Sequence, residues 1–356
     1  MRQLQFLGLI CALVTFTWPG HAGDTVANDE SKWDQFAADT ENAFTQHENA
    51  VNKSWEKMRQ RVLRKWADGA LPERKSYVEY SAQDTARVKV DYDHGSVTVE
   101  ALVDSKDNAP AAAKGKITKA LSAVVTQDVK SANAILSTDD LAATNIPVKE
   151  LVTSLTAAPV SSGVERGGDG QERGLYRVTF KLVPGYVQRR AAKYKPLVDL
   201  WAKKYNLDPA LILGIMRQES AFNPRARSWV GALGLMQIYP PYAGKEVFKV
   251  VKHQDVIPSD DFLYDAANNV MMGATFLQIL RDKYFSDIKD KEKQRYLMIC
   301  AYNWSAVRLR KAIERGRLSI RAPASEVFDR LEHITPAETQ DYLKKVTKYA
   351  QEFRGN

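Results

Sequence analysis

The chain has 356 residues, 44% of them hydrophobic, which is enough to form two domains with apolar cores. Lysine and arginine outnumber acidic residues by 51 to 43, and the formal net charge of +8 suits an anionic partner as well as simple solubility. The two cysteines, Cys11 and Cys300, exclude a scaffold of several disulfides and a metal cluster built from cysteine ligands.

The first 22 residues have the organisation of a secretory signal peptide. Arg2 precedes an apolar stretch, and small residues up to Ala22 form a cleavage site. The apolar run is shorter than the ~20 residues of a membrane-spanning helix. Cys11 does not follow the Leu-Ala/Ser-Gly/Ala triplet of a lipoprotein signal. We therefore expect export to the periplasm or cell envelope as a soluble protein with no transmembrane helix in the mature chain.

The N-terminal half begins with helix-forming sequence and continues with strands. Residues 30–67 are polar, with aromatic and aliphatic residues at roughly helical spacing, which predicts one or two amphipathic helices. Residues 86–103 then alternate between apolar and polar side chains. Val88, Val90 and Tyr92 share one face, and an Asp-His-Gly turn separates them from a second alternating run. This pattern predicts a β-hairpin.

Three further segments complete the first half of the chain. Residues 108–127 read as a helix, and the stretch 174–187 contains a strand that runs through Tyr176, Val178, Phe180 and Leu182. The glycine-rich stretch 161–174 between them is expected to be a loop. It is not a phosphate-binding loop, because neither GxGxxG nor GKS/T occurs in it.

Beyond Pro184-Gly185 the pattern predicts helices only. Asp208 and Pro209 are an N-cap and a first-turn proline, and they open a helix that ends in Glu219. Other helices are expected at 194–207, 265–284, 293–315 and 335–353. We therefore predict an α+β N-terminal domain over residues 23–190 and an all-α domain over residues 191–356.

Glu219 ends an apolar helix face, which is an unusual place for a carboxylate. Leu211 and Ile215 lie eight and four residues before it, with Ile212 and Met216 beside them. A carboxyl group among aliphatic side chains loses hydration in its charged form, so its pKa should rise. Such a group can act as a general acid near neutral pH. The plain alternative is a solvent-edge or salt-bridged glutamate in a last helical turn.

Residues 219–238 resemble the signature of lytic transglycosylases with the goose-type lysozyme-like (SLT) fold. Matching elements in order and spacing are Glu219-Ser220, Phe222, Asn223-Pro224, Ala226, Ser228, Gly231-Ala232 and Gly234-Leu235-Met236-Gln237. The triplet Ala-Tyr-Asn at 301–303 and the segment 338–346 are similar to two later motifs, so the resemblance covers 192–354. Residues 75–102 look like the domain that precedes the catalytic module in the murein transglycosylase C subgroup. The implied second domain is an all-α, lysozyme-like catalytic domain.

This resemblance implies cleavage of peptidoglycan with Glu219 as the single acid/base. Glu219 would protonate the oxygen between N-acetylmuramic acid and N-acetylglucosamine, then accept the proton of the muramoyl C6 hydroxyl as a 1,6-anhydro ring closes. No positioned water or second carboxylate is then needed. Tyr302 corresponds to the tyrosine whose hydroxyl reaches the catalytic carboxyl. Residues in glycan-binding positions are Ser228, Met236, Gln237, Asn303 and Tyr342. Of these, Met236 and Tyr342 also suit plain packing roles, and Asn303 could instead brace the motif loop.

Other interpretations of these residues remain open. A hydrolase of the same fold would use one of several acids between 246 and 265, and a non-catalytic glycan-binding protein would keep the fold without turnover. Trp304-Ser305 stands where the family usually has a glycine, and residues 238–244 depart from its usual pattern. Expected partners are peptidoglycan glycan strands and proteins of the cell-wall machinery. We expect no nucleic acid, cofactor or metal, since no matching motif occurs.

Overall fold

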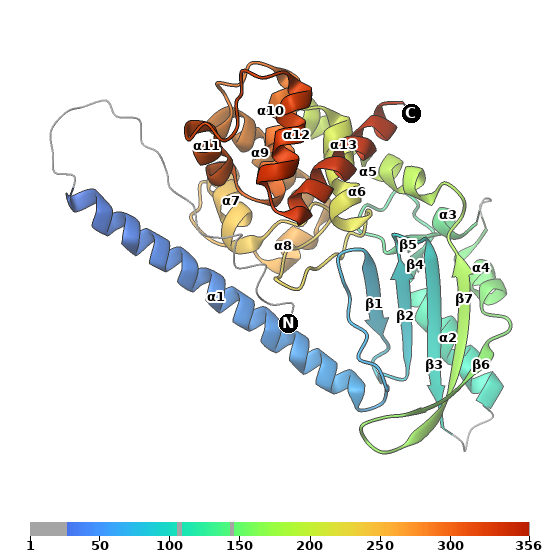
Figure 1. Cartoon of the computed structure of the whole chain (residues 1–356). Helices are drawn as coiled ribbons and strands as arrows, with labels where there is room; N and C mark the ends of the chain where they lie inside the picture. Colours follow the sequence, from blue (N-terminus) through green and yellow to red (C-terminus); the bar gives the residue numbers. More distant parts are fainter. Residues whose placement is uncertain (1–26, 105–108, 143–145, 356) are drawn as a thin grey trace.

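The computed structural model describes residues 27–104, 109–142 and 146–355 (Figure 1). The signal peptide expected over residues 1–22 lies outside them. A long helix, a β-sheet and a helical region follow one another along the chain. Within the described ranges, no helix combines the length and the apolar character needed to span a bilayer.

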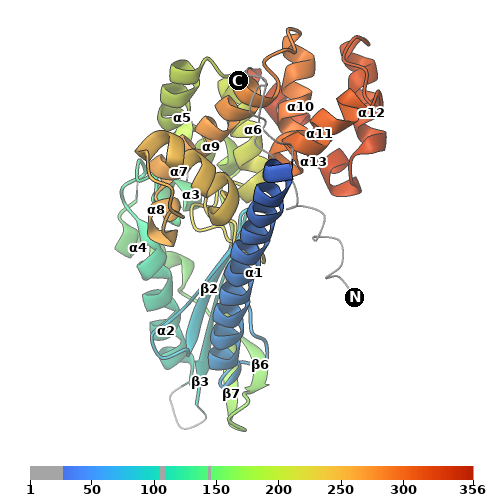
Figure 2. The same ribbon diagram turned by 90° about the vertical axis from the view of Figure 1, so that its left-hand side faces the viewer.

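Helix α1 (Ala27–Leu63) confirms the helix expected in this region, as one continuous element. Its C-terminal end packs on the sheet, where Val62 and the following Trp66 are fully buried. Its middle contacts the helical region, and the rings of Trp55 and Trp229 lie 5.7 Å apart. The helix therefore runs along both parts of the molecule (Figure 2).

The sheet is antiparallel with the order β1-β2-β3-β7-β6. The strands are β1 (Ser76–Tyr80), β2 (Ala86–Asp91), β3 (Ser96–Val103), β6 (Val160–Arg166) and β7 (Glu172–Lys181). The expected hairpin is confirmed as β2 and β3, in which Val88 faces Val99 and Val90 faces Val97. The strand expected through Tyr176, Val178 and Phe180 is confirmed as β7, which ends at Lys181, one residue before Leu182.

The prediction of a loop over residues 161–174 is wrong. Most of this stretch belongs to β6 and the start of β7, which pair with each other around a turn at 167–171. β6 is the edge strand, and its Val164 is 68% exposed. An edge strand is held by backbone hydrogen bonds and buries little, so the apolar alternation that reveals inner strands is missing.

The two faces of the sheet are stabilised in different ways. Helix α2 (Ala109–Val124) covers one face, and its Ile117 and Leu121 pack in the same core as the valines of β2 and β3. On the other face Arg87 is buried and its Nε lies 2.7 Å from Glu100 Oε2, beneath the ring of Trp66. Burial alone would raise the pKa of Glu100, but Arg87 and Lys89 outweigh it and lower that pKa to about 2.

Short elements lie in the chain between α2 and β6. They are β4 (Val125–Thr126), β5 (Leu136–Ser137), α3 (Thr138–Leu141) and α4 (Val148–Leu155). β4 and β5 form a parallel pair. The helix expected over residues 108–127 is thus α2 followed by the two residues of β4.

The helical region confirms the expected all-α character from residue 186 to residue 354. Its α-helices are α5 (Tyr186–Tyr205), α6 (Pro209–Ser220), α7 (Lys245–Lys252), α8 (Asp260–Tyr264), α9 (Ala266–Ile279), α10 (Lys291–Asn303), α11 (Ala306–Glu314), α12 (Ala324–Ile334) and α13 (Ala337–Arg354). Two wider π-helical turns, η2 (Pro240–Gly244) and η3 (Leu280–Tyr284), precede α7 and follow α9. Cys300 is fully buried in α10, as expected of a small core residue.

Two expected helix boundaries need correction. The predicted helix over 293–315 is two helices, because the chain breaks at Trp304 and Ser305. The Ser305 hydroxyl accepts a hydrogen bond from the backbone N–H of Arg308, which starts α11 as a new helix. α5 begins at Tyr186, eight residues before the start of the predicted amphipathic stretch at 194.

Arg190 of α5 joins the sheet region to the helical region. Its side chain is fully buried, and its Nη1 lies 2.9 Å from Asp140 Oδ2 of α3. Nη1 also donates to the carbonyl of Ile135, and Nη2 donates to the carbonyl of Phe222 just beyond α6. One side chain thereby connects the loop before β5, helix α3 and the end of α6.

Candidate active site

Glu219 lies in the last turn of α6, and the sequence explains why α6 begins where it does. Asp208 accepts a hydrogen bond from the N–H of Ala210 and caps the start of the helix, as predicted. The helix stops at Ala221 and Phe222, which both have left-handed backbone conformations with φ of 48° and 63°. Such conformations are uncommon for residues with a side chain, and they often occur at functional sites.

Close packing against α13 brings Glu219 near that helix. A Cβ added at Gly214 would lie 3.0 Å from the backbone nitrogen of Ala350 and 3.1 Å from the carbonyl oxygen of Val346. The missing side chain lets the two backbones approach, and Tyr342 of α13 comes close to the Glu219 carboxyl as a result.

The Glu219 side chain is almost entirely buried, with 6% of the residue exposed. Burial raises the pKa of Glu219 above its usual value, as expected from the sequence. The Arg74 guanidinium and the Tyr342 hydroxyl offset part of this effect, and the negative charge of Glu338 adds to it. A carboxyl group in these surroundings holds its proton to a higher pH than an exposed glutamate.

Two tyrosines face the carboxyl of Glu219. The sequence led us to expect the Tyr302 hydroxyl to reach this carboxyl, but it donates to the carbonyl of Met236 at 2.8 Å. The Tyr342 hydroxyl interacts with Glu219 but forms no well-aligned hydrogen bond with it or with any other described group. Burial and the charge of Glu219 raise the pKa of both phenols, so both remain protonated.

The remaining candidates lie on the loop that follows α6. The Met236 side chain is fully buried and packs against Gly273, so it does not line an open surface. Gln237 has φ of 48°, and its Nε2 donates to the carbonyl of Gly234 at 3.0 Å. Its Oε1 is buried without a hydrogen-bond partner. Ser228 accepts a hydrogen bond from the N–H of Ala232 at 2.9 Å, which shapes the loop.

Asn303 and Trp304 lie where α10 ends. Asn303 Oδ1 accepts a hydrogen bond from the Thr339 hydroxyl at 2.7 Å, which fixes the end of α10 against α13. Trp304 lines a hollow of about 220 Å³ together with Arg308 and Ile334. The departure from the family pattern at this position therefore places a large ring beside the start of α11.

Two neighbours of the candidate site had no signal in the sequence. Buried Asn269 of α9 donates to the carbonyls of Leu233 and Leu263 and accepts from the N–H of Met236, which fixes the loop. Arg74, in the segment before β1, has its Nη2 3.9 Å from Glu219 Oε2. Arg74 and Glu219 are 145 residues apart in the chain, so only the tertiary fold brings them together.

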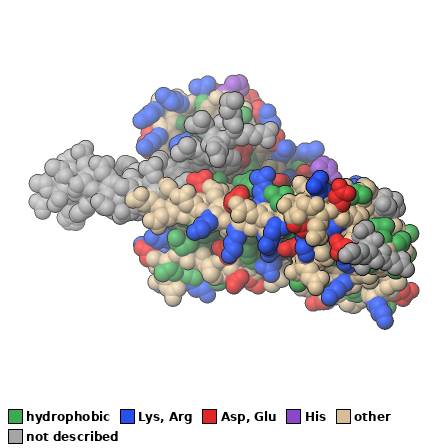
Figure 3. Space-filling model, turned by 90° about the horizontal axis from the view of Figure 1, so that it is seen from below, with side chains coloured by type: hydrophobic (Ala, Val, Ile, Leu, Met, Phe, Trp, Pro, Cys, Tyr) green, Lys and Arg blue, Asp and Glu red, His purple; other side chains and the backbone are tan. Residues whose placement is uncertain are grey.

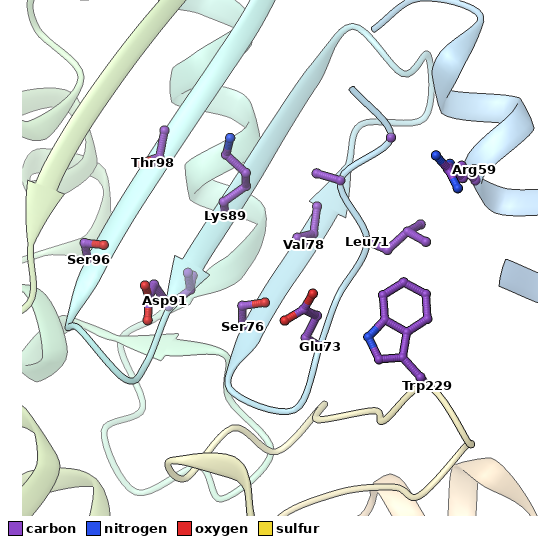
Figure 4. A pocket seen from close by; sticks show the side chains of 13 residues that line it. Arg59, Leu71, Glu73, Ser76, Val78, Lys89, Asp91, Ser96, Thr98 and Trp229 are labelled. Atoms are coloured by element: carbon purple, nitrogen blue, oxygen red, sulfur yellow. The ribbon is translucent and has the colours of Figure 1, made fainter. Parts of the chain in front are cut away.

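A hollow beside this site is lined by residues on either side of Arg74 but not by Glu219. It measures about 610 Å³ and lies between Trp229, α1 and the face of β1, β2 and β3 (Figure 4). Glu73 and Ser76, which flank Arg74 and Lys75, contribute to its wall. Trp229 is 58% exposed. On the face of the molecule in Figure 3, basic side chains are interspersed with acidic ones.

No group of three or more histidine, cysteine, aspartate or glutamate side chains is arranged to hold a metal ion within the described part of the chain. The surroundings of Glu219 suit acid–base chemistry. The carboxyl is buried, has a raised pKa, and lies next to one cation and two phenols.

Two family descriptions match the chain. Residues 196–320 match "Transglycosylase SLT domain", and residues 44–146 match "Membrane-bound lytic murein transglycosylase C, N-terminal domain". The first range contains Glu219 and most of the predicted site residues, and the second contains Arg74.

Curated relatives share both regions. Membrane-bound lytic murein transglycosylase C of Salmonella arizonae is 31% identical over 301 residues, 79% of this chain and 82% of the relative. Proteins of the same name from Actinobacillus pleuropneumoniae serotype 5b and Mannheimia succiniciproducens are 29% and 28% identical over 79% and 88% of this chain. They are covered over 80% and 92% of their own lengths. The solved 70-kDa soluble lytic transglycosylase of Escherichia coli is 26% identical over 48% of this chain and 28% of its own, with a TM-score of 0.38.

Proposed function

The chain belongs to the lytic murein transglycosylases with an SLT domain and the N-terminal domain of the C subgroup, and on that basis we propose that Glu219 is its catalytic acid/base. We propose as its reaction the cleavage of the β-1,4 bond between N-acetylmuramic acid and N-acetylglucosamine without water. The observation that carries the assignment of Glu219 is its burial, which raises the pKa of the carboxyl.

The reaction uses one carboxyl group twice. Protonated Glu219 donates its proton to the glycosidic oxygen as the bond from that oxygen to C1 of the muramoyl residue breaks. The resulting Glu219 carboxylate accepts the proton of the muramoyl C6 hydroxyl while O6 bonds to C1. The products are a free N-acetylglucosamine hydroxyl and a 1,6-anhydromuramoyl end. Glu219 is protonated again at the end of the cycle.

The tyrosines support this cycle by holding the carboxyl in place. Tyr342 presents a protonated hydroxyl with no other hydrogen-bond partner, so it can donate to the carboxylate form of Glu219. Tyr302 acts indirectly, because its hydroxyl donates a hydrogen bond that fixes the carbonyl of Met236. We propose Ser228, Gln237 and Asn303 as polar contacts for hydroxyl and acetamido groups of the glycan. Met236 would support that surface from beneath.

A hydrolase of the same fold is the alternative reaction. Hydrolytic glycosidases require a second carboxylate, about 5–5.5 Å away in retaining enzymes and about 6.5–9.5 Å away in inverting ones. Glu338 of α13 is a carboxylate whose charge affects Glu219, and it is exposed. It is therefore the residue to test for a hydrolytic role.

Digestion of purified sacculi, with mass spectrometry of the products, distinguishes these reactions. We expect anhydromuramoyl ends from the wild type and from Glu338→Gln, and a loss of at least about 100-fold in Glu219→Gln. Reducing ends would identify a hydrolase. Unchanged turnover in Glu219→Gln would refute the role of Glu219, and binding of sacculi without products would identify a glycan-binding protein.

We also propose that the protein acts in the cell envelope, where its substrate lies. Relatives carry the name "membrane-bound", so the soluble state expected from the signal sequence remains a prediction. Peptidoglycan is the partner that the family supports, and contacts with the cell-wall machinery likewise remain a prediction.

A further inference from the structure

The segment before β1 packs directly on the catalytic end of α6. Buried Asn223 directs its Nδ2 toward the carbonyl oxygens of Glu73, Arg74 and Ser76 at 3.5, 3.3 and 3.5 Å. These three contacts hold the segment in one position relative to α6. The sheet region is therefore attached within four residues of Glu219.

Arg74 points from this segment onto the last turn of α6. Its Nε donates to the carbonyl oxygen of Glu219 at 3.2 Å, and its Nη2 donates to that of Gln218 at 3.3 Å. Carbonyls at a helix C-terminus carry partial negative charge and lack partners within the helix, so a guanidinium is well placed there. The cation is thus anchored by the backbone rather than by an acidic side chain.

The same cation lies near the carboxyl without neutralising it fully. Nη2 is 3.9 Å from Glu219 Oε2, which is too long for a direct hydrogen bond. The Arg74 side chain is 32% exposed, compared with 8% for that of Glu219. Arg74 therefore provides a fixed positive charge next to the oxygen that gains negative charge during catalysis.

We propose that Arg74 is a positioning residue of the active site, supplied by the N-terminal domain, which stabilises the Glu219 carboxylate as it forms during proton transfer. The inference rests on the proposed role of Glu219. Negative charge develops on the carboxyl when it protonates the glycosidic oxygen, so a preorganised cation lowers the energy of that transition state. This gives the N-terminal domain a direct part in the chemistry.

Other charged and titratable groups around Glu219 act on the same equilibrium. The groups that face it from the elements packed around it are Arg74, Lys75, Tyr302, Glu338 and Tyr342. Burial and Glu338 raise the pKa of Glu219, whereas Arg74, Tyr342 and Lys75 lower it. Lys75 has its Nζ 3.0 Å from Asp93, so its charge is already balanced. Arg74 is therefore the cation whose removal should be felt most strongly.

The test is the pH dependence of sacculus digestion by Arg74→Gln, with Arg74→Lys and Lys75→Gln beside it. Glutamine keeps a donor for the helix carbonyls but removes the charge. We expect the alkaline limb of kcat against pH to move to higher pH, because Glu219 keeps its proton longer. At neutral pH kcat should fall by about tenfold, which corresponds to about 1.4 kcal/mol of transition-state stabilisation. Arg74→Lys should recover most of both effects, and Lys75→Gln should resemble the wild type.

A purely structural role for Arg74 would give a different result. Arg74→Gln would then lower the melting temperature and the amount of active protein but leave the alkaline limb of the kcat–pH profile where it is in the wild type. That outcome would overturn the proposal. An equal shift of the alkaline limb in Lys75→Gln would also overturn the proposal, because the loss of any nearby positive charge would then have the same effect. If Glu219→Gln stays active, the proposed function itself fails. If Glu219→Gln is inactive and Arg74→Gln shows no shift, only this inference fails.

Discussion

Replacing Asp140 by asparagine should destabilise the whole protein strongly, because it leaves the buried Arg190 guanidinium without its counter-charge. Burial by itself would raise the pKa of Asp140, but Arg190, Lys193 and hydrogen bonds from Ser137 together lower it. The carboxylate is therefore ionised in the folded state. Asparagine has nearly the same size, so the change tests charge rather than packing.

The size of this destabilisation depends on the contacts that Arg190 keeps. Removing one partner of a buried ion pair typically costs about 3–5 kcal/mol. In Asp140→Asn, Arg190 keeps its hydrogen bonds to the carbonyls of Ile135 and Phe222, which still satisfy part of the guanidinium. We therefore expect a loss near the lower limit, about 3 kcal/mol in the free energy of unfolding at pH 7.

Urea unfolding followed by circular dichroism measures this loss, and Asp199→Asn is the matched control. Asp199 pairs with Lys195 on the surface of α5, the helix that carries Arg190. An exposed pair of this kind contributes about 0.3–0.5 kcal/mol. A loss below about 1 kcal/mol in Asp140→Asn would refute the reasoning. So would a double variant, Arg190→Met with Asp140→Leu, that is as unstable as the sum of its single changes.

Two further predictions concern packing and acid stability. Gly214→Ala should lower the free energy of unfolding by about 1–3 kcal/mol and reduce sacculus digestion, because the new methyl group pushes α13 away from α6. Thermal unfolding and product yield test this. The control is Gly115→Ala, where an added Cβ meets no atom within 4 Å. Glu100 has a lowered pKa of about 2, so its contribution to stability is complete above its usual pKa of 4.5 and is lost as the pH falls toward 2. Glu100→Gln should therefore lose less stability between pH 5 and pH 3 than the wild type does, and an equal loss in urea midpoints would contradict this.

Local sequence predicted those parts of the fold in which neighbouring residues determine the structure. The alternation through Val88 and Val90 predicted the hairpin, because one face of each strand is buried. Asp208 and Pro209 predicted the start of α6, because a cap acts within one helical turn. The expected rise in the pKa of Glu219 agreed with the structure, although the tyrosines beside its carboxyl, Tyr302 and Tyr342, lie on other helices.

Features that depend on distant residues could not be predicted in this way. The edge strand β6 has no apolar alternation, because it is held by backbone hydrogen bonds to β7. At the end of α10, Asn303 accepts a hydrogen bond from the hydroxyl of Thr339, which lies 36 residues further along the chain. The contact between Arg74 and Glu219 requires the segment before β1 to fold back on α6, and no short motif encodes such an approach.

The turn after Glu219 joins the sheet region closely to α6. Left-handed conformations at Ala221 and Phe222 each cost roughly 1–3 kcal/mol, and they persist only where surrounding contacts enforce them. Arg190 binds the carbonyl of Phe222, and the side chain of the next residue, Asn223, binds the segment that carries Arg74. The contacts that hold the strained turn are therefore the contacts that bring a cation to Glu219. Loosening this junction would therefore also move the Glu219 carboxyl and its charged neighbour.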